Sequence, residues 1–209
     1  MADAWPMITA ERQATADLLE TLGPDQLSTP SLCAGWTVRD VAGHMISAAE
    51  MTPGSFIGGL TRAGFSFNTM TARNLAACRD GDGHQLAARL RAKAGGRNHP
   101  PGPTVAMLGE AVVHAEDVRR PLGLPRDVPE ATLVAAADFY QGSNLLIGSK
   151  GRIAGLRLEA TDASWTHGDG PVVRGPMLAL VLAMTGRRAA AADLEGEGLA
   201  TLTGRMAPG

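Results

Sequence analysis

The run GEAVVHAED holds two residues, Glu110 and His114, whose chemical types suit metal binding. They stand four positions apart in a stretch of helical pattern, and side chains at that spacing project from the same face of a helix. A second histidine, His44, lies in another stretch of helical pattern, TVRDVAGHM. Two imidazoles and one carboxylate suit a catalytic zinc or a similar divalent ion with an open coordination position. The spacing alone equally fits a solvated ion pair or a hydrogen-bonded core histidine.

The segments that must position these side chains are mainly helical. Thr37 and Asp40 resemble a capping box, which predicts that the helix carrying His44 begins at this point. Residues 52–67 combine proline, several glycines and phenylalanines, and we interpret them as an irregular or partly helical connection. Short strand-like runs follow residue 151, before a last apolar helix. The apolar spacing predicts helices over residues 5–22, 37–51, 68–78, 84–93, 104–120 and 129–146.

Composition excludes several classes of protein. The net charge is -2, which argues against an electrostatic nucleic-acid binder. No apolar run reaches the roughly 18 residues of a membrane span, and the N-terminal residues lack the order of a secretion signal. We therefore expect a cytoplasmic protein with no membrane partner. In that compartment the two cysteines, Cys33 and Cys78, are expected to be reduced, with Cys33 in a small, buried, apolar role.

Three blocks of sequence resemble one known family. They are LCAGWTVRDVAGHM, EAVVHAEDVRRPLG, and a C-terminal pair formed by DASWTHGDGP and VRGPMLALVLAMTGR. In this order they are similar to the mycothiol-dependent maleylpyruvate isomerase family, which belongs to the DinB-like superfamily of metal-binding bundles. The resemblance implies a mainly α, α+β chain. A DinB-like four-helix bundle would cover residues 1–148, and a small α/β domain covering residues 149–209 would close over the metal cavity.

The resemblance also implies which residues form the site. His44, Glu110 and His114 would bind one divalent metal, with zinc expected, and mycothiol would serve as the thiol cosubstrate. An arginine of the C-terminal domain would reach a charged group of the thiol or of the substrate. Arg187 is the first choice, as a catalytic and cofactor-binding residue, and Arg174 is the second cofactor-binding candidate. Arg187 equally fits a cap at the end of a helix.

Asp117 is a further catalytic candidate, because it lies nearly one turn after His114 on the predicted helix. It could accept a hydrogen bond from a ligand imidazole or form an ion pair with Arg120. Asp40, one turn before His44, fits a capping role better than a contact with that histidine.

The expected function is activation of a small-molecule thiol as a metal-bound thiolate that adds to an electrophilic substrate. Release of the thiol after bond rotation would make the protein a cis–trans isomerase, whereas retention would make it a mycothiol S-transferase. Two other classes stay open: a non-enzymatic metal- or ligand-binding protein, and a hydrolase that uses a metal-bound hydroxide. The expected assembly is a monomer or a homodimer.

Overall fold

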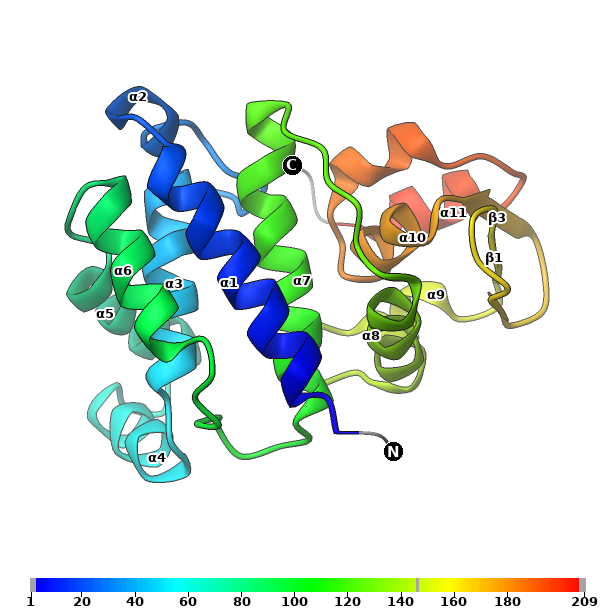
Figure 1. Cartoon of the computed structure of the whole chain (residues 1–209). Coiled ribbons are helices and arrows are strands. Elements are labelled where there is room, and N and C mark those ends of the chain that lie inside the picture. The colour runs from blue at the N-terminus through cyan, green and yellow to red at the C-terminus, as the bar shows by residue number, and fades with distance from the viewer. Residues whose placement is uncertain (1–2, 146, 207–209) are drawn as a thin grey trace. The chain divides into compact units, whose positions relative to one another are not determined.

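The structure is a computed structural model that describes residues 3–145 and 147–206. Tertiary packing divides the chain into two units, Met1–Pro125 and Arg126–Gly209, and Figure 1 shows the helices and strands of each. The first unit is helical and the second is mixed, so the chain has the mainly α, α+β class that the sequence predicts.

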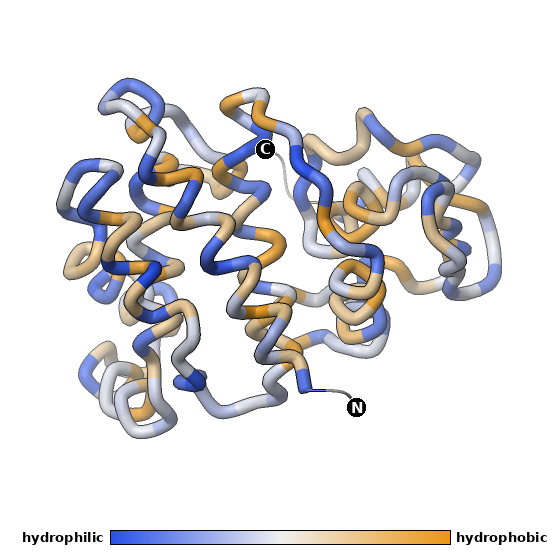
Figure 2. The backbone as a smooth tube through the Cα atoms, viewed as in Figure 1, coloured by the Kyte–Doolittle hydropathy of each residue, from blue (hydrophilic) through white to orange (hydrophobic). Residues whose placement is uncertain are grey.

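Four long helices of the first unit form a bundle. Two of them, α1 (Trp5–Thr21) and α3 (Val38–Glu50), each pack against both α6 (Gly83–Lys93) and α7 (Val105–Arg119). The four helices therefore close around a shared core. Small residues permit this close packing: a Cβ added at Gly83 would lie 2.4 Å from the main-chain oxygen of Leu19. Figure 2 shows hydrophobic and hydrophilic stretches alternating along these helices, which is the pattern of an amphipathic bundle.

The start of α3 is fixed by the capping box that the sequence predicts. The Thr37 N–H donates to Asp40 Oδ2 at 2.9 Å, and the Asp40 N–H donates to Thr37 Oγ1 at 3.3 Å. Asp40 also accepts a hydrogen bond from Arg79 at 3.1 Å. Gly43, next to His44, lets this helix approach the end of α5 (Phe67–Cys78), since an added Cβ would lie 2.8 Å from Arg79 Cα. These contacts fix the helix on which His44 lies.

The connection expected to be irregular or partly helical forms a regular helix, α4 (Pro53–Arg62). Thr52 caps it through Ser55, and Pro53 occupies its first turn, where a missing N–H costs nothing. All ten residues of α4 are at least partly exposed. Ile57 and Phe65 are 58% and 76% exposed, and Phe65 adopts a positive φ of 62° in the turn after the helix. The remaining short helices of this unit are α2 (Pro24–Leu27) and η1 (Arg120–Leu122).

The second unit combines a small sheet with short helices. β1 is the central strand, antiparallel to β2 and parallel to β3. Leu158 of β1 pairs with His167 on one side and with Val173 on the other. The strands are β1 (Arg157–Ala160), β2 (Thr166–His167) and β3 (Val172–Gly175), and the helices are α8 (Glu130–Gly142), α9 (Ser149–Ile153), α10 (Met177–Met184), η2 (Arg188–Asp193) and α11 (Leu199–Gly204).

The boundary between the units lies after Pro125, not after residue 148 as the sequence analysis expects. The reason is that α8 packs against α10 and buries Leu133 and Ala136 within the second unit. A hydrogen bond also holds α8 in the second unit, since Trp165 Nε1 donates to Asp138 Oδ1 of this helix at 3.0 Å. This helix also ends earlier than expected, and Leu146 lies outside the described residues.

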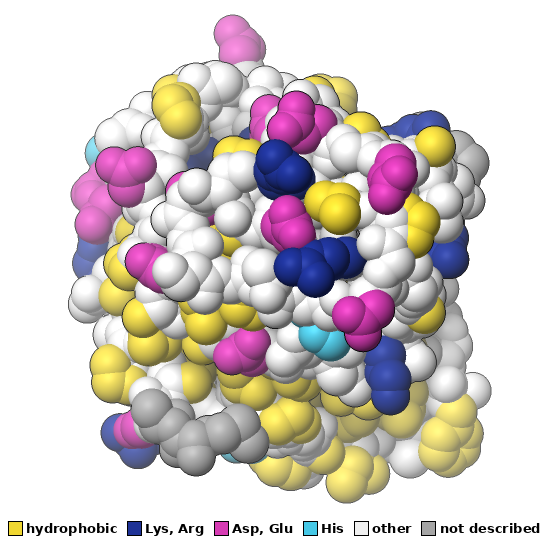
Figure 3. Space-filling view, turned by 90° about the vertical axis from the view of Figure 1, so that its right-hand side faces the viewer, with side chains coloured by type: hydrophobic (Ala, Val, Ile, Leu, Met, Phe, Trp, Pro, Cys, Tyr) yellow, Lys and Arg dark blue, Asp and Glu magenta, His cyan; other side chains and the backbone are white. Residues whose placement is uncertain are grey.

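The surface and the helix lengths bear on possible partners. Within the described part of the chain, every helix is too short or too polar to span a bilayer. On the face drawn in Figure 3, acidic and basic side chains are interspersed rather than gathered by sign.

Candidate metal centre

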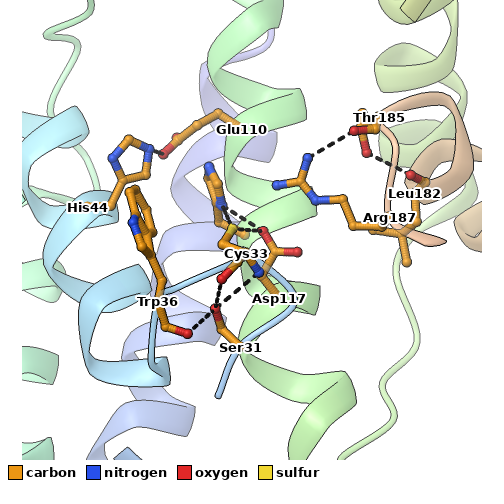
Figure 4. A network of polar contacts seen from close by, with 10 residues as sticks. Ser31, Cys33, Trp36, His44, Glu110, Asp117, Leu182, Thr185 and Arg187 are labelled. Carbon is orange, nitrogen blue, oxygen red and sulfur yellow. Dashed lines mark hydrogen bonds and ion pairs between the residues drawn. The ribbon is translucent and has the colours of Figure 1, made fainter. Parts of the chain in front are cut away.

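His44, Glu110 and His114 converge inside the bundle. His44 comes from α3, whereas Glu110 and His114 come from adjacent turns of α7, which packs against α3. One ligand atom from each lies within 4.8 Å of the other two. His44 Nε2 is 3.7 Å from Glu110 Oε1, and Figure 4 shows these two side chains pointing toward each other. The rings of His44 and His114 meet edge to face with centroids 4.7 Å apart. The convergence expected from the sequence is present, and the metal role stays a prediction.

Glu110 carries the feature that most suggests a cation. Its Oε1 is buried and has no hydrogen-bond partner among residues 3–145 and 147–206. Burial raises the pKa of this carboxyl, although the charges of His114 and Arg12 oppose the shift. A buried carboxylate oxygen without a donor is costly unless a positive group satisfies it. The site therefore favours a cation beside Glu110.

Arg12 of α1 supplies part of the positive charge near Glu110. It is only 1% exposed, and its Nη1 donates to the main-chain oxygen of Gly96 at 3.2 Å. Burial lowers the pKa of Arg12, and the charge of Glu110 opposes that change. Sequence reasoning missed this residue, because an arginine near an apolar stripe is an ordinary irregularity of an amphipathic helix. The only signal in the sequence was a charged residue close to the apolar face of the predicted helix.

His114 is oriented by a buried carboxylate. Its Nδ1 lies 2.8 Å from Asp117 Oδ2, and the side chain of Asp117 is fully buried. Burial alone would lower the pKa of His114, but hydrogen bonds to Asp117 and Cys33 and the charges of Asp117 and Glu110 raise it to about 10. A raised pKa favours the protonated ring, so a metal that binds this histidine must displace a proton. The structure shows one of the roles expected for Asp117, the contact with the imidazole, and Arg120 lies 3.8 Å from Glu116 as well.

The loop before α3 brings two more residues to the site. Cys33 Sγ donates to Asp117 Oδ2 at 3.1 Å and lies 3.9 Å from His114 Nδ1. The Trp36 ring packs against the His44 ring with centroids 5.3 Å apart. The expectation that Cys33 has a small, buried, apolar role is wrong, because the side chain is half-buried and touches this polar pair. The contact joins residues 81 positions apart, which no local pattern predicts.

The two arginine candidates belong to the second unit and differ in their surroundings. Arg187 follows α10, is half-buried, and donates from Nη1 to the main-chain oxygen of Thr185 at 3.2 Å, as Figure 4 shows. This contact agrees with the capping role. Arg174 lies on β3 with a side chain that is 51% exposed, and its Nε is 3.6 Å from Glu159 Oε2. Both assignments to cofactor binding stay predictions.

The donor set fits a divalent ion. Zinc holds nitrogen and oxygen ligands at about 2.0–2.2 Å, which places tetrahedral neighbours about 3.3 Å apart. The separation of 3.7 Å between His44 Nε2 and Glu110 Oε1 is close to that value. Because the hydrogen bond to Asp117 uses Nδ1 of His114, its Nε2 is the nitrogen left for a metal. Three protein donors on two facing helices define a helical-bundle protein with a candidate metal centre and one open coordination position.

The comparisons with known proteins agree with this class. Residues 8–99 match the family model described as the mycothiol maleylpyruvate isomerase N-terminal domain. A crystal structure of the mycothiol-dependent maleylpyruvate isomerase matches with a TM-score of 0.57 at 18% identity, over 94% of this chain and 96% of that one. A mutant of that isomerase matches with a TM-score of 0.53, also at 18% identity and with the same coverage. No curated protein sequence matches. The match over residues 8–99 supports the family resemblance, and the solved structures show that the fold is shared.

Proposed function

We propose that this protein is a metal-dependent enzyme that uses mycothiol as a thiol cosubstrate. The observation that carries the proposal is the convergence of His44, Glu110 and His114 around a buried carboxylate oxygen that has no hydrogen-bond partner among the described residues. The domain match over residues 8–99 supports the choice of thiol, since the matching family is named for mycothiol. The reaction is either cis–trans isomerisation of a maleylpyruvate-like acid or S-transfer of the thiol to an electrophile.

Each residue of the site has a distinct part in this proposal. His44, Glu110 and His114 hold the metal, with zinc the expected ion. A bound divalent ion supplies positive charge that lowers the pKa of a thiol, so that the sulfur is a nucleophile at neutral pH. Asp117 accepts a hydrogen bond from His114 Nδ1 and so keeps the other ring nitrogen available as a donor.

Arg187 would bind a carboxylate or another anionic group of the thiol or substrate. A guanidinium suits this task because it forms paired hydrogen bonds with planar anions. Arg174 is the weaker candidate, since its guanidinium lies close to Glu159. The shared step of both reactions is addition of the thiol sulfur to an electrophilic carbon. Release of the thiol after bond rotation then gives isomerisation, and its retention gives S-transfer.

The test combines metal content, thiol binding and turnover. The purified protein is loaded with zinc, and its melting temperature is measured with mycothiol, bacillithiol and glutathione. We expect stabilisation by mycothiol that depends on the metal. Turnover is then followed with maleylpyruvate and with a general aromatic electrophile.

Two results would contradict the proposal. Turnover that is equally fast without any thiol would favour hydrolysis by a metal-bound hydroxide. Binding of metal and thiol without turnover of either substrate would favour the non-enzymatic binding protein.

A further inference from the structure

The loop that carries Cys33 is held in a defined shape. Ser31 and Trp36 are joined across it by a main-chain hydrogen bond of 2.8 Å, and the Val38 N–H donates to the Thr29 oxygen at 2.9 Å. Inside the loop, Ser31 Oγ accepts a hydrogen bond from the Cys33 N–H at 3.1 Å and donates to the Trp36 oxygen at 2.9 Å. These hydrogen bonds fix the main chain on both sides of Cys33, and so they fix the place from which its thiol projects.

This loop makes two hydrogen bonds to Asp117 of α7. The Leu32 N–H donates to the Asp117 main-chain oxygen at 3.3 Å, and Cys33 Sγ donates to Asp117 Oδ2 at 3.1 Å. The same carboxylate oxygen lies 2.8 Å from His114 Nδ1. One oxygen of a fully buried carboxylate is thus shared by a thiol from the loop and an imidazole from the helix, as Figure 4 shows for Cys33 and Asp117.

We propose that Cys33 is a positioning residue for the metal centre, acting through Asp117 on His114. The proposal rests on the proposed metal role of His114. Hydrogen-bond partners of ligating histidines set the ring orientation and the tautomer, and they affect metal affinity measurably. Cys33 lies on the loop and not on α7, and its hydrogen bond to the Asp117 carboxylate holds that carboxylate toward the His114 ring. Removing the thiol donor loosens Asp117, and metal affinity falls although all three metal donors remain.

The same distances admit one other reading, in which Cys33 itself binds the metal. Cys33, His114 and Asp117 also offer three ligand atoms within 4.8 Å of one another. That arrangement would use His114 Nδ1 and would leave Glu110 and His44 outside the centre. Cobalt separates the two readings, because a cobalt–thiolate bond gives a strong near-ultraviolet absorption that nitrogen and oxygen ligands do not.

The experiment compares the full-length wild type with Cys33→Ser, Cys33→Ala and the matched control Cys78→Ala. Zinc dissociation constants are measured by competition with a chromophoric chelator, melting temperatures are recorded without metal, and cobalt spectra are collected. We expect Cys33→Ala to bind zinc about two- to tenfold more weakly, as for the loss of one ordinary hydrogen bond. Cys33→Ser keeps a donor and is expected to bind within about twofold of the wild type. Cys78→Ala is expected to bind like the wild type, and the cobalt spectra should lack a thiolate band.

Three results would overturn the inference. Equal zinc affinity of the wild type and Cys33→Ala would show that the contact with Asp117 does not matter. Equal weakening in Cys33→Ser and Cys33→Ala would show that the hydrogen-bond donor is not the cause. A thiolate band that disappears in Cys33→Ser would make Cys33 a ligand. A wild type that does not bind zinc at all would instead refute the proposed function, so the two failures are distinguishable.

Discussion

His114 is the residue at which the metal donors and the hydrogen-bond network meet. Its substitution by alanine removes one donor and leaves the Asp117 carboxylate without that partner. We expect His114→Ala to lose stoichiometric zinc and thiol-dependent turnover, while the circular dichroism of the helices is retained because alanine favours helix. Metal content after dialysis measures the effect. His84→Ala is the matched control, since that side chain is 77% exposed. Full zinc content in His114→Ala would contradict the proposed site.

The two cysteines are expected to differ in reactivity. Cys78 is 8% exposed, and burial raises the pKa of its thiol, so that little thiolate forms at neutral pH. Cys33 is half-buried at the candidate site. An aromatic disulfide that releases a coloured thiol should therefore react rapidly with one cysteine of the native protein and with both after unfolding. The rapid phase should be absent in Cys33→Ser. A rapid phase that persists in that variant would assign the accessible thiol to Cys78.

The sequence predicts that His44, Glu110 and His114 come together, but not which side chains surround them. Glu110 and His114 were accessible to sequence reasoning because a four-residue spacing on a helix is a local pattern. Cys33 and Arg12 were not, because each reaches the site through packing between segments far apart in the chain. Asp117 was left between two roles, and the buried contact with His114 supports the first of them, the hydrogen bond to the imidazole.

At the scale of elements, the start of α3 offers a test of pH dependence. Burial alone would raise the pKa of Asp40, but hydrogen bonds from Thr37 and Arg79 and the charge of Arg79 outweigh it and lower the pKa. A lowered folded-state pKa means that this stabilisation is complete above the unfolded value of about 3.9 and is lost as pH falls through the folded value. Asp40→Asn should therefore destabilise the protein by about 1–2 kcal/mol near neutral pH.

Urea unfolding of the wild type and Asp40→Asn at several pH values measures this contribution. The difference in unfolding free energy should be constant from pH 7 down to about pH 5 and should shrink below about pH 4. Asp25→Asn, at an exposed position in the short helix α2, serves as a control for the loss of one carboxylate. A difference that grows on acidification would contradict the assignment.

The start of α3 was predicted from its cap, whereas α4 was expected to be only irregular or partly helical although it is capped too. Thr37 and Asp40 mark the start of α3 in the sequence and in the structure. The segment that became α4 contains Gly54, Gly58 and Gly59, and its composition favours a loop. Its helical state depends on the Thr52 cap and on packing against α5, and packing is not visible in composition.

At the scale of the whole molecule, the metal donors and the candidate anion-binding arginine belong to different units. We therefore expect Arg187→Ala to leave zinc affinity unchanged while weakening use of the charged thiol or substrate by about 1.5–3 kcal/mol. Steady-state kinetics with zinc titration in parallel measures both properties. Arg174→Ala is the comparison and should have a smaller effect, because that side chain is half exposed and lies close to Glu159. The reverse order of effects would reassign the anion-binding role to Arg174.

The position of the boundary between the units could not be obtained from periodicity. The apolar residues of α8, such as Leu133 and Ala137, predict that one helix face is buried, but not which partner buries it. The change to strand-like runs near residue 151 predicted a boundary after this helix, which placed it with the bundle. Its packing against α10 places it with the sheet instead.

The exposure of α4 has a consequence for the rates at which the backbone opens. A helix whose residues are all partly exposed has few apolar contacts to lose when it unravels, so its opening should require much less free energy than global unfolding. In deuterium exchange, the amides of residues 54–62 in α4 should therefore exchange in a fast phase that is separate from the slow phase of α3 and α7. Equal protection of these three helices would mean that the first unit opens only as a whole. A separate fast phase would mean that α4 unfolds and refolds many times while α3, which carries His44, and α7 stay folded.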